Sequence, residues 1–230
     1  RIIDSTRLYK EGHNMDKRVV FAVAGSGKTS SIIDLLVADS RCLLITYTEN
    51  NTHHLKHSVI RKFGCIPDGI KIYSYFNFLY SFCFRPICGH EIKTKGINFD
   101  YPLPQYAQRT SKKLLAHYVD KNKRLFSNRI AKLLIEFNAI PEILQRIEKF
   151  FDLVCIDEIQ DFAANDFNLL CALVEANVNI RLVGDFYQHT FDTSRDGNTQ
   201  NSLHDSFPQY CNKLEKSGFI IDLTSLSNSY

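Results

Sequence analysis

The chain has 230 residues, of which 44% are hydrophobic and 23% are charged. These are ordinary values for a folded globular protein, and they exclude a disordered or low-complexity chain. No apolar run approaches the roughly 18 residues that a membrane-spanning helix needs, and residues 1–14 lack the apolar core of a secretion signal. The seven cysteines, an odd number, are scattered along the chain, which favours reduced thiols in a cytoplasmic protein over a disulfide framework.

The net charge of +3 is unevenly distributed. Between Arg109 and Lys132 the sequence has eight basic residues and one acid, Asp120. Such a block on an otherwise mildly acidic chain is either a contact surface for a polyanion or a solvated helix face. Charge alone does not separate these two interpretations.

Strand-like apolar runs alternate with helical patterns along most of the chain. The expected strands are 18–24, 42–47, 70–73, 151–156, 180–183 and 219–223. The expected helices run from a glycine turn to about residue 38, cover 51–63, 75–84 and 166–175, and include one that starts at Pro141. This alternation predicts an α/β fold, a parallel sheet with helices on both faces.

Residues 86–138 differ in character, because they combine a basic helical pattern with no clear strand. We therefore expect a small, basic helical insertion at 86–138. It would interrupt one discontinuous domain made of residues 15–85 and 139–230. Residues 1–14 precede the single methionine, Met15, and are expected to be a leader or non-native residues.

The segment AVAGSGKT (22–29) lies between the first expected strand and the first helix. Gly25 and Gly27 let the backbone wrap round a phosphate, Lys28 can reach the terminal phosphates, and the Thr29 hydroxyl can bind Mg²⁺. The pattern is that of a P-loop NTPase, except that alanine stands first. A glycine-rich corner without a ligand would not require Gly-Lys-Thr in this register. The expected phosphate-binding residues are Ala24, Gly25, Ser26, Gly27, Lys28, Thr29 and Ser30.

A pair of acids, Asp157 and Glu158, directly follows the expected strand at 151–156. The carboxyl ends of parallel strands form the sheet edge where ligands bind. There Asp157 can hold Mg²⁺, and Glu158 can take a proton from an attacking water. An acidic strand end alone is common in turns, but together with the phosphate loop it predicts an ATPase site.

The strand at 180–183 ends in a similar way, in LVGDFYQH (182–189), and places Asp185 and Gln188 in the same row of loops. The neutral amide of Gln188 suits a sensor of the γ-phosphate, because it can bond to phosphate and water without adding charge. Taken alone, Gly-Asp is an ordinary turn.

These segments together resemble the UvrD/Rep family of superfamily 1 helicases. The resemblance rests on AVAGSGKT (22–29), ITYTENNTHHLKH (45–57), IYSYFNFL (72–79), FDLVCIDEIQDF (151–162) and LVGDFYQHTF (182–191), in the family's order. It implies the first of two RecA-like P-loop ATPase domains, with ATP and Mg²⁺ as cofactors and single-stranded DNA as partner. It further implies 3′–5′ movement that needs a second RecA-like domain, from a longer chain or a partner protein. The chain alone is then expected to hydrolyse ATP weakly or not at all.

The resemblance also implies roles for single residues. Lys28, Glu158 and Gln188 would be catalytic, and Thr29 and Asp157 would hold Mg²⁺. The remaining implied nucleotide contacts are Asp185 and Tyr230, the latter stacked on adenine. The implied DNA contacts are Tyr47, Thr48, Ser74, Tyr75, Phe76 and Phe191. The family's upstream glutamine, which reads adenine, has no counterpart, because the first glutamine of this chain is Gln105.

Three alternatives remain open. A nucleotide-gated switch or helicase-like subunit, acting with a nuclease or repair protein, would keep the phosphate loop without motor activity. A small-molecule kinase would share the loop, but it has no use for the Asp-Glu-Ile-Gln-Asp sequence (157–161). A zinc module on Cys83, Cys88 and His90 would need a better spacing and a fourth ligand, so buried thiols are favoured there.

Overall fold

The computed structural model describes residues 15–23, 25–188 and 203–225. In these ranges six strands form one sheet in the order β3-β2-β6-β7-β1-β8, and every neighbouring pair is parallel. The strands are β1 (Lys17–Phe21), β2 (Cys42–Thr46), β3 (Ile70–Ser74), β6 (Leu153–Ile156), β7 (Asn179–Gly184) and β8 (Ile220–Asp222). The predicted parallel sheet is therefore confirmed, as are all six expected strands within a few residues at their ends.

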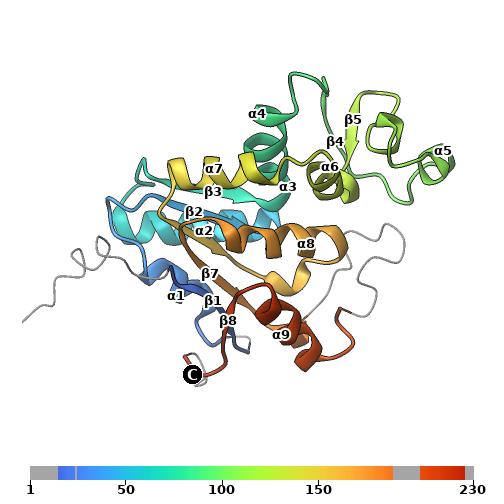
Figure 1. Ribbon diagram of the computed structural model, residues 1–230. Helices are drawn as coiled ribbons and strands as arrows, with labels where there is room; N and C mark the ends of the chain where they lie inside the picture. Colours follow the sequence, from blue (N-terminus) through green and yellow to red (C-terminus); the bar gives the residue numbers. More distant parts are fainter. Residues whose placement is uncertain (1–14, 24, 189–202, 226–230) are drawn as a thin grey trace, which may run out of the picture.

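Helices cover both faces of this sheet, as the alternation of strands and helices predicted (Figure 1). On one face α1 (Lys28–Asp34) and α2 (Glu49–Phe63) pack on one set of alternate strand residues. On the other face α7 (Ile140–Phe150), α8 (Ala164–Ala172) and α9 (Phe207–Lys216) pack on the opposite set. The two hydrophobic cores follow from strands that are buried on both sides, which is why these strands read as continuous apolar runs.

The helix α9 has no counterpart among the sequence-based expectations. It begins after Ser206 with Pro208 in its first turn, and Tyr210 and Leu214 are buried against the sheet. Proline at this position is typical of a helix start, so the sequence did contain a usable signal.

The expected aromatic helix at 75–84 is present and runs on to residue 87. It consists of α3 (Tyr75–Asn77), wider π-helical turns over Phe78–Phe84 and α4 (Arg85–Ile87). Most of its aromatic side chains belong to the core, where they contact the face of the sheet that carries α7 and α8. Within the described residues, no helix is long and apolar enough to span a membrane.

The insertion is less helical than its sequence indicated. Its elements are β4 (Gly96–Asn98), α5 (Gln105–Arg109), β5 (Arg124–Phe126) and α6 (Ile130–Glu136), with single 3₁₀ turns at Leu115–His117 and Ser127–Arg129. β4 and β5 pair in parallel as a separate two-stranded sheet. The expectation of a strand-free insertion is therefore wrong, and so is that of a basic helix through this region.

A tight turn at Asp120 explains why the basic pattern does not form a continuous helix. The Asp120 carboxylate accepts hydrogen bonds from the backbone nitrogens of Asn122 and Arg124, both at 2.8 Å. Lys123 adopts a left-handed conformation with φ +62°. A short acidic side chain that bonds to nearby backbone N–H groups competes with helix formation, and here it prevails.

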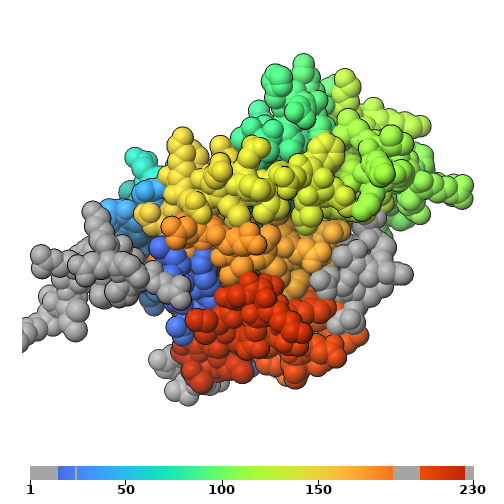
Figure 2. Space-filling view, viewed as in Figure 1, coloured from blue at the N-terminus to red at the C-terminus, as the bar shows by residue number. Residues whose placement is uncertain are grey.

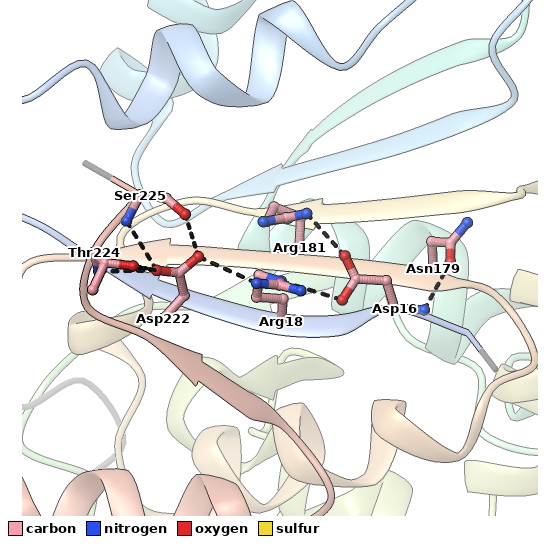
Figure 3. Close-up of polar contacts among 7 residues, drawn as sticks. All are labelled: Asp16, Arg18, Asn179, Arg181, Asp222, Thr224 and Ser225. Atoms are coloured by element: carbon pink, nitrogen blue, oxygen red, sulfur yellow. Dashed lines mark hydrogen bonds and ion pairs between the residues drawn. The ribbon is translucent and has the colours of Figure 1, made fainter. Parts of the chain in front are cut away.

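Charged side chains join the three strands β7, β1 and β8 (Figure 3). Arg18 on β1 bonds to Asp16 and to Asp222 of β8, and Arg181 on β7 bonds to Asp16 at 3.0 Å. Asp222 also accepts hydrogen bonds from the hydroxyl and the backbone N–H of Ser225, which hold the pKa of its carboxyl below the ordinary range. This ladder fixes β8 and the turn after it to the strand that carries the phosphate loop.

Candidate nucleotide site

Three neighbouring strand ends bring the predicted site residues together. In the sheet β7 lies between β6 and β1, so Asp157 after β6, Asp185 after β7 and the loop after β1 share one edge. The Thr29 hydroxyl donates to Asp157 Oδ2 at 3.0 Å. The Lys28 ammonium lies 3.8 Å from Asp185 Oδ2. Residues that are far apart in sequence thus form one polar cluster.

The phosphate loop has the backbone geometry that its glycines allow. Gly25 and Gly27 have φ +78° and +85°, values that other residues adopt only with strain. The Lys28 ammonium donates to the carbonyls of Ala22 and Val23 at 2.9 and 3.0 Å, so the lysine folds back over its own loop. Among the other predicted phosphate contacts, Ser26 is buried and Ser30 is exposed. Ala24 lies outside the described residues.

Asp157 is 3% exposed, and this burial raises the pKa of its carboxyl to about 6. The neighbouring Glu158 acts in the same direction. Hydrogen bonds from the Thr29 hydroxyl and the Glu158 backbone, and the charge of Lys28, act against the shift. A buried carboxylate that is short of positive charge is a good ligand for a small cation, because the cation restores the ionised form.

Glu158 has φ +58°, a left-handed conformation that is uncommon for a residue with a side chain. Its backbone N–H donates to Asp157 Oδ1 at 2.9 Å, and this bond fixes the Glu158 backbone against the Asp157 carboxylate. Strained backbone of this kind costs of order 1–3 kcal/mol and is concentrated at functional sites. The turn directs the two carboxylates differently, Asp157 toward Thr29 and Glu158 toward Gln160.

Gln160 connects two strand ends, a role that the sequence did not reveal. It is 2% exposed, its amide nitrogen donates to Glu158 Oε2 at 2.6 Å, and its amide oxygen accepts from the Asp185 backbone N–H at 2.9 Å. A Cβ atom at Gly184 would lie 2.7 Å from that amide oxygen and 2.7 Å from Ile159 Cγ1. Glycine is thus required at the end of β7 for Gln160 to reach across.

The aromatic residues predicted to contact DNA are mostly in the core. Tyr75 is 2% exposed, and its hydroxyl donates to Asp166 at 2.9 Å. Tyr47 is 9% exposed and has ring contacts with Tyr75, Phe76 and Phe162 at 5.7 to 5.8 Å. Neither the Tyr47 nor the Tyr75 ring is available to stack on a base, because both fill space beneath the sheet edge. Base stacking by these two rings is therefore excluded, and the wider expectation that the two residues contact DNA stays a prediction.

The other predicted contacts have different surroundings. Thr48 caps α2 by accepting from the Asn51 backbone N–H at 3.1 Å, and the buried Ser74 donates to the Glu49 carboxylate. Phe76 is half-buried. Gln188 is exposed just beyond β7. Two more predicted residues, Phe191 and Tyr230, lie outside the described residues.

The donor atoms at this edge fit Mg²⁺, which prefers oxygen ligands. The Thr29 hydroxyl and the Asp157 carboxylate are adjacent, and they follow the carboxyl ends of two different strands, β1 and β6. The Ser26 hydroxyl is buried and has no hydrogen-bond partner among the described residues, as expected for a loop that surrounds a further polar group.

The zinc alternative gains no structural support. Cys83 and Cys88 are buried, and burial raises the pKa of both thiols, which opposes thiolate ligation. Over the described part of the chain, no group of three or more His, Cys, Asp or Glu side chains is positioned to hold a metal ion.

Comparison with known proteins gives one family match. Residues 90–203 match the model of the UvrD/REP helicase N-terminal domain, a segment that includes the ends of β6 and β7 but not the phosphate loop. No curated protein matches the chain. Among solved structures, Bacteroides sp. Pif1 in complex with ADP-AlF4 is similar, with 16% identity and a TM-score of 0.35. The match covers 83% of this chain and 32% of that one. The resemblance to the N-terminal domain of UvrD/REP helicases is therefore confirmed, over residues 90–203.

Proposed function

We propose that this chain is the nucleotide-binding half of an ATP-driven motor that acts on single-stranded DNA. The observation that carries the proposal is the 3.0 Å contact between the Thr29 hydroxyl and Asp157, with Lys28 only 3.8 Å from Asp185. A P-loop lysine and hydroxyl beside an acidic strand end are the parts that phosphoryl transfer requires. The match to a helicase domain family supports a helicase-type ATPase over a small-molecule kinase.

Each residue at the edge has a defined task in this proposal. The loop from Gly25 to Thr29 binds the phosphates, and Lys28 leaves the Ala22 and Val23 carbonyls to reach the terminal ones. Thr29 and Asp157 hold Mg²⁺. Bound Mg-ATP supplies the phosphoryl group that is transferred. Glu158 accepts the proton of the attacking water, in the orientation that Gln160 imposes.

In this proposal Gln188 couples the γ-phosphate to movement of the DNA strand. Gln188 is exposed three residues beyond Asp185, and its backbone N–H donates to the Asp185 carbonyl at 3.0 Å. A change at the phosphates that moves Asp185 would therefore also move Gln188. A second RecA-like domain would complete the site with arginines, which raise phosphoryl-transfer rates by about 10³–10⁵ in related systems. Without them we expect slow hydrolysis.

Nucleotide binding is the first test. Titration with a fluorescent ATP analogue should show tight binding in Mg²⁺, weaker binding in EDTA, and a loss of at least about tenfold in affinity for Lys28→Ala. Lys216→Ala, an exposed lysine near the end of α9, is the matched control. Equal affinity for both variants would contradict the proposal at its first step.

DNA dependence is the second test and separates the motor from the switch. Hydrolysis is measured with and without single-stranded DNA, on this chain and on a form that includes a second RecA-like domain. A motor requires strong stimulation by DNA in the two-domain form. Nucleotide binding with no response to DNA in either form would reject the motor and favour the nucleotide-gated switch.

A further inference from the structure

Two large aromatic side chains stand exposed where the insertion meets the sheet domain. Phe99 is 60% exposed and Tyr101 is 73% exposed, and both follow the end of β4. The Phe99 ring contacts Phe76 edge to face, with the ring centres 5.1 Å apart. Since Phe76 is the second residue after β3, Phe99 lies at the same edge of the sheet as the nucleotide site.

The turn that carries these rings is fixed by its own hydrogen bonds. Asn98 is 5% exposed, its amide nitrogen donates to Asp120 Oδ2 at 2.8 Å, and its amide oxygen accepts from the Asp100 backbone N–H at 2.7 Å. Pairing of β4 with β5 holds the other side of the turn. The rings are therefore presented on a preorganised support, which lowers the entropy cost of binding a ligand.

Exposed lysines lie on the same two-stranded sheet as this turn, where Lys95 directly precedes β4 and Lys123 directly precedes β5. Lys95, Lys121 and Lys123 are exposed, and the Lys95 backbone N–H donates to the Lys123 carbonyl at 2.7 Å, which places the two lysines side by side. The two nearby acids are engaged by Arg124, which lies 2.9 Å from Asp120 and 3.6 Å from Asp100. The lysines remain to attract a polyanion.

The Asp120 carboxyl keeps its charge in this arrangement. Burial acts to raise its pKa, but hydrogen bonds from the Arg124 backbone, the Asn98 amide and the Arg124 guanidinium outweigh burial and lower the pKa. The support of the turn is therefore ionised and intact at neutral pH.

We propose that Phe99 and Tyr101 form a stacking surface for the bases of a single-stranded nucleic acid, with Lys95 and Lys123 contacting its phosphates. Exposed rings next to cationic groups are the combination by which proteins bind single strands without sequence preference. Bases paired in a duplex already stack on each other, so the rings select an unpaired strand. This inference rests on the proposed function, because it assumes a nucleic-acid partner.

Phe99 and Tyr101 can stack on bases, whereas Tyr47 and Tyr75 cannot. Those rings are packed in the core, whereas Phe99 connects to the same aromatic cluster through Phe76 and reaches solvent. Figure 2 shows the insertion, in green, as a lobe that projects from the body of the molecule beside the sheet domain. A strand that follows the sheet edge would pass this lobe.

The test is the affinity of this chain for a labelled poly-dT oligonucleotide, measured by fluorescence anisotropy. Replacing Phe99 and Tyr101 by leucine keeps apolar volume but removes the flat rings. We expect affinity to fall by between about 5-fold and about 150-fold for each lost stacking contact. Tyr101→Phe, which keeps the ring, should bind like the wild type. The matched control is Phe150→Ala, because Phe150 is 43% exposed next to Arg146 and Lys149 but precedes β6, at the opposite edge of the sheet.

A strand with abasic sites distinguishes stacking from charge. Without bases, wild type and the double leucine variant should bind equally. A double variant that binds poly-dT as tightly as the wild type, or that loses the same affinity for the abasic strand, would overturn the inference while leaving the proposed function intact. Failure of the wild type to bind any single strand would instead contradict the proposed partner. Lys123→Ala should weaken binding to both strands and reduce the salt dependence by about one phosphate contact.

Discussion

The carboxyl edge of the sheet and the insertion are both rich in polar residues, yet local sequence predicted the arrangement of these residues only at the edge. At the edge, Lys28, Thr29, Asp157 and Asp185 lie where their strands end, and a parallel sheet brings those ends together. In the insertion, the basic block that suggested one helix is divided among the end of α5, several turns, the short strand β5 and α6. Position relative to a strand end is thus a stronger predictor than composition.

The difference has a physical origin. A strand end in a parallel sheet can lie only at one edge, so every residue that follows a strand has a predictable place. A basic residue in a helical pattern has no such constraint, because its charge is satisfied by solvent in many conformations. The insertion adopts a conformation that buries Tyr118, Leu125 and Phe126. The pattern of charges does not predict this burial.

The largest expected effect is at the edge. Glu158→Gln removes the proposed base while keeping its shape and its bond from Gln160, and hydrolysis should fall by about 10²–10⁴-fold with nucleotide affinity unchanged. Hydrolysis under single-turnover conditions, with protein in excess over ATP and in a form that includes a second RecA-like domain, measures the rate. Glu175→Gln, on the exposed surface, is the control. If this variant hydrolyses ATP at the wild-type rate, Glu158 is not the catalytic base that the sequence predicts.

The next prediction compares how much a core aromatic side chain and an exposed one in the insertion contribute to the free energy of unfolding. Tyr75→Ala should lower the free energy of unfolding by about 3–5 kcal/mol, because its buried ring and its bond to Asp166 are lost. Tyr101→Ala should change it by less than about 0.5 kcal/mol, because that ring is 73% exposed. Urea denaturation measures both. Similar losses for the two variants would contradict the division between core and surface.

Burial of Asp157 predicts a pH dependence of stability in EDTA. The pKa of about 6 in the folded chain is above the ordinary value of 3.8, so folding favours the protonated carboxyl. The contribution of the Asp157 carboxyl to the free energy of unfolding is fully present below about pH 4 and is lost as pH rises toward about 6. The free energy of unfolding changes by about 3 kcal/mol at most over this range. Asp157→Asn should therefore be more stable than wild type at about pH 7.5 and equal at about pH 4. Thermal melts at both values check this, and a destabilised variant at the higher pH would refute it.

The smallest effect concerns Gln160. In Gln160→Glu one oxygen can still accept from the Asp185 N–H, but the other faces Glu158 where the amide donated at 2.6 Å. Repulsion should displace Glu158 and slow hydrolysis by about 5- to 150-fold, with little change in nucleotide affinity. Gln145→Glu, exposed on α7, is the control. Equal losses of affinity and rate would indicate a general disturbance of the site instead.

The sequence alone determined the sheet, its helices except α9, and most of the residues at its edge. Strands buried on both faces must be continuous apolar runs, and a phosphate loop must have glycine where φ is positive, so both features are visible in local sequence. The resemblance to the UvrD/Rep helicases rested on those same local segments. The match over residues 90–203 confirms the resemblance for the part of the chain that holds the segments after β6 and β7.

Tertiary structure decided which of these side chains have free access and which are packed. Tyr47, Tyr75, Phe76 and Phe99 are equally aromatic in the sequence, but packing buries the first two and leaves Phe99 in solvent. Gln160 acquires its role only because β7 lies beside β6 and ends in a glycine. Burial and contact between distant strands depend on how the whole chain packs, so local sequence patterns cannot encode them by themselves.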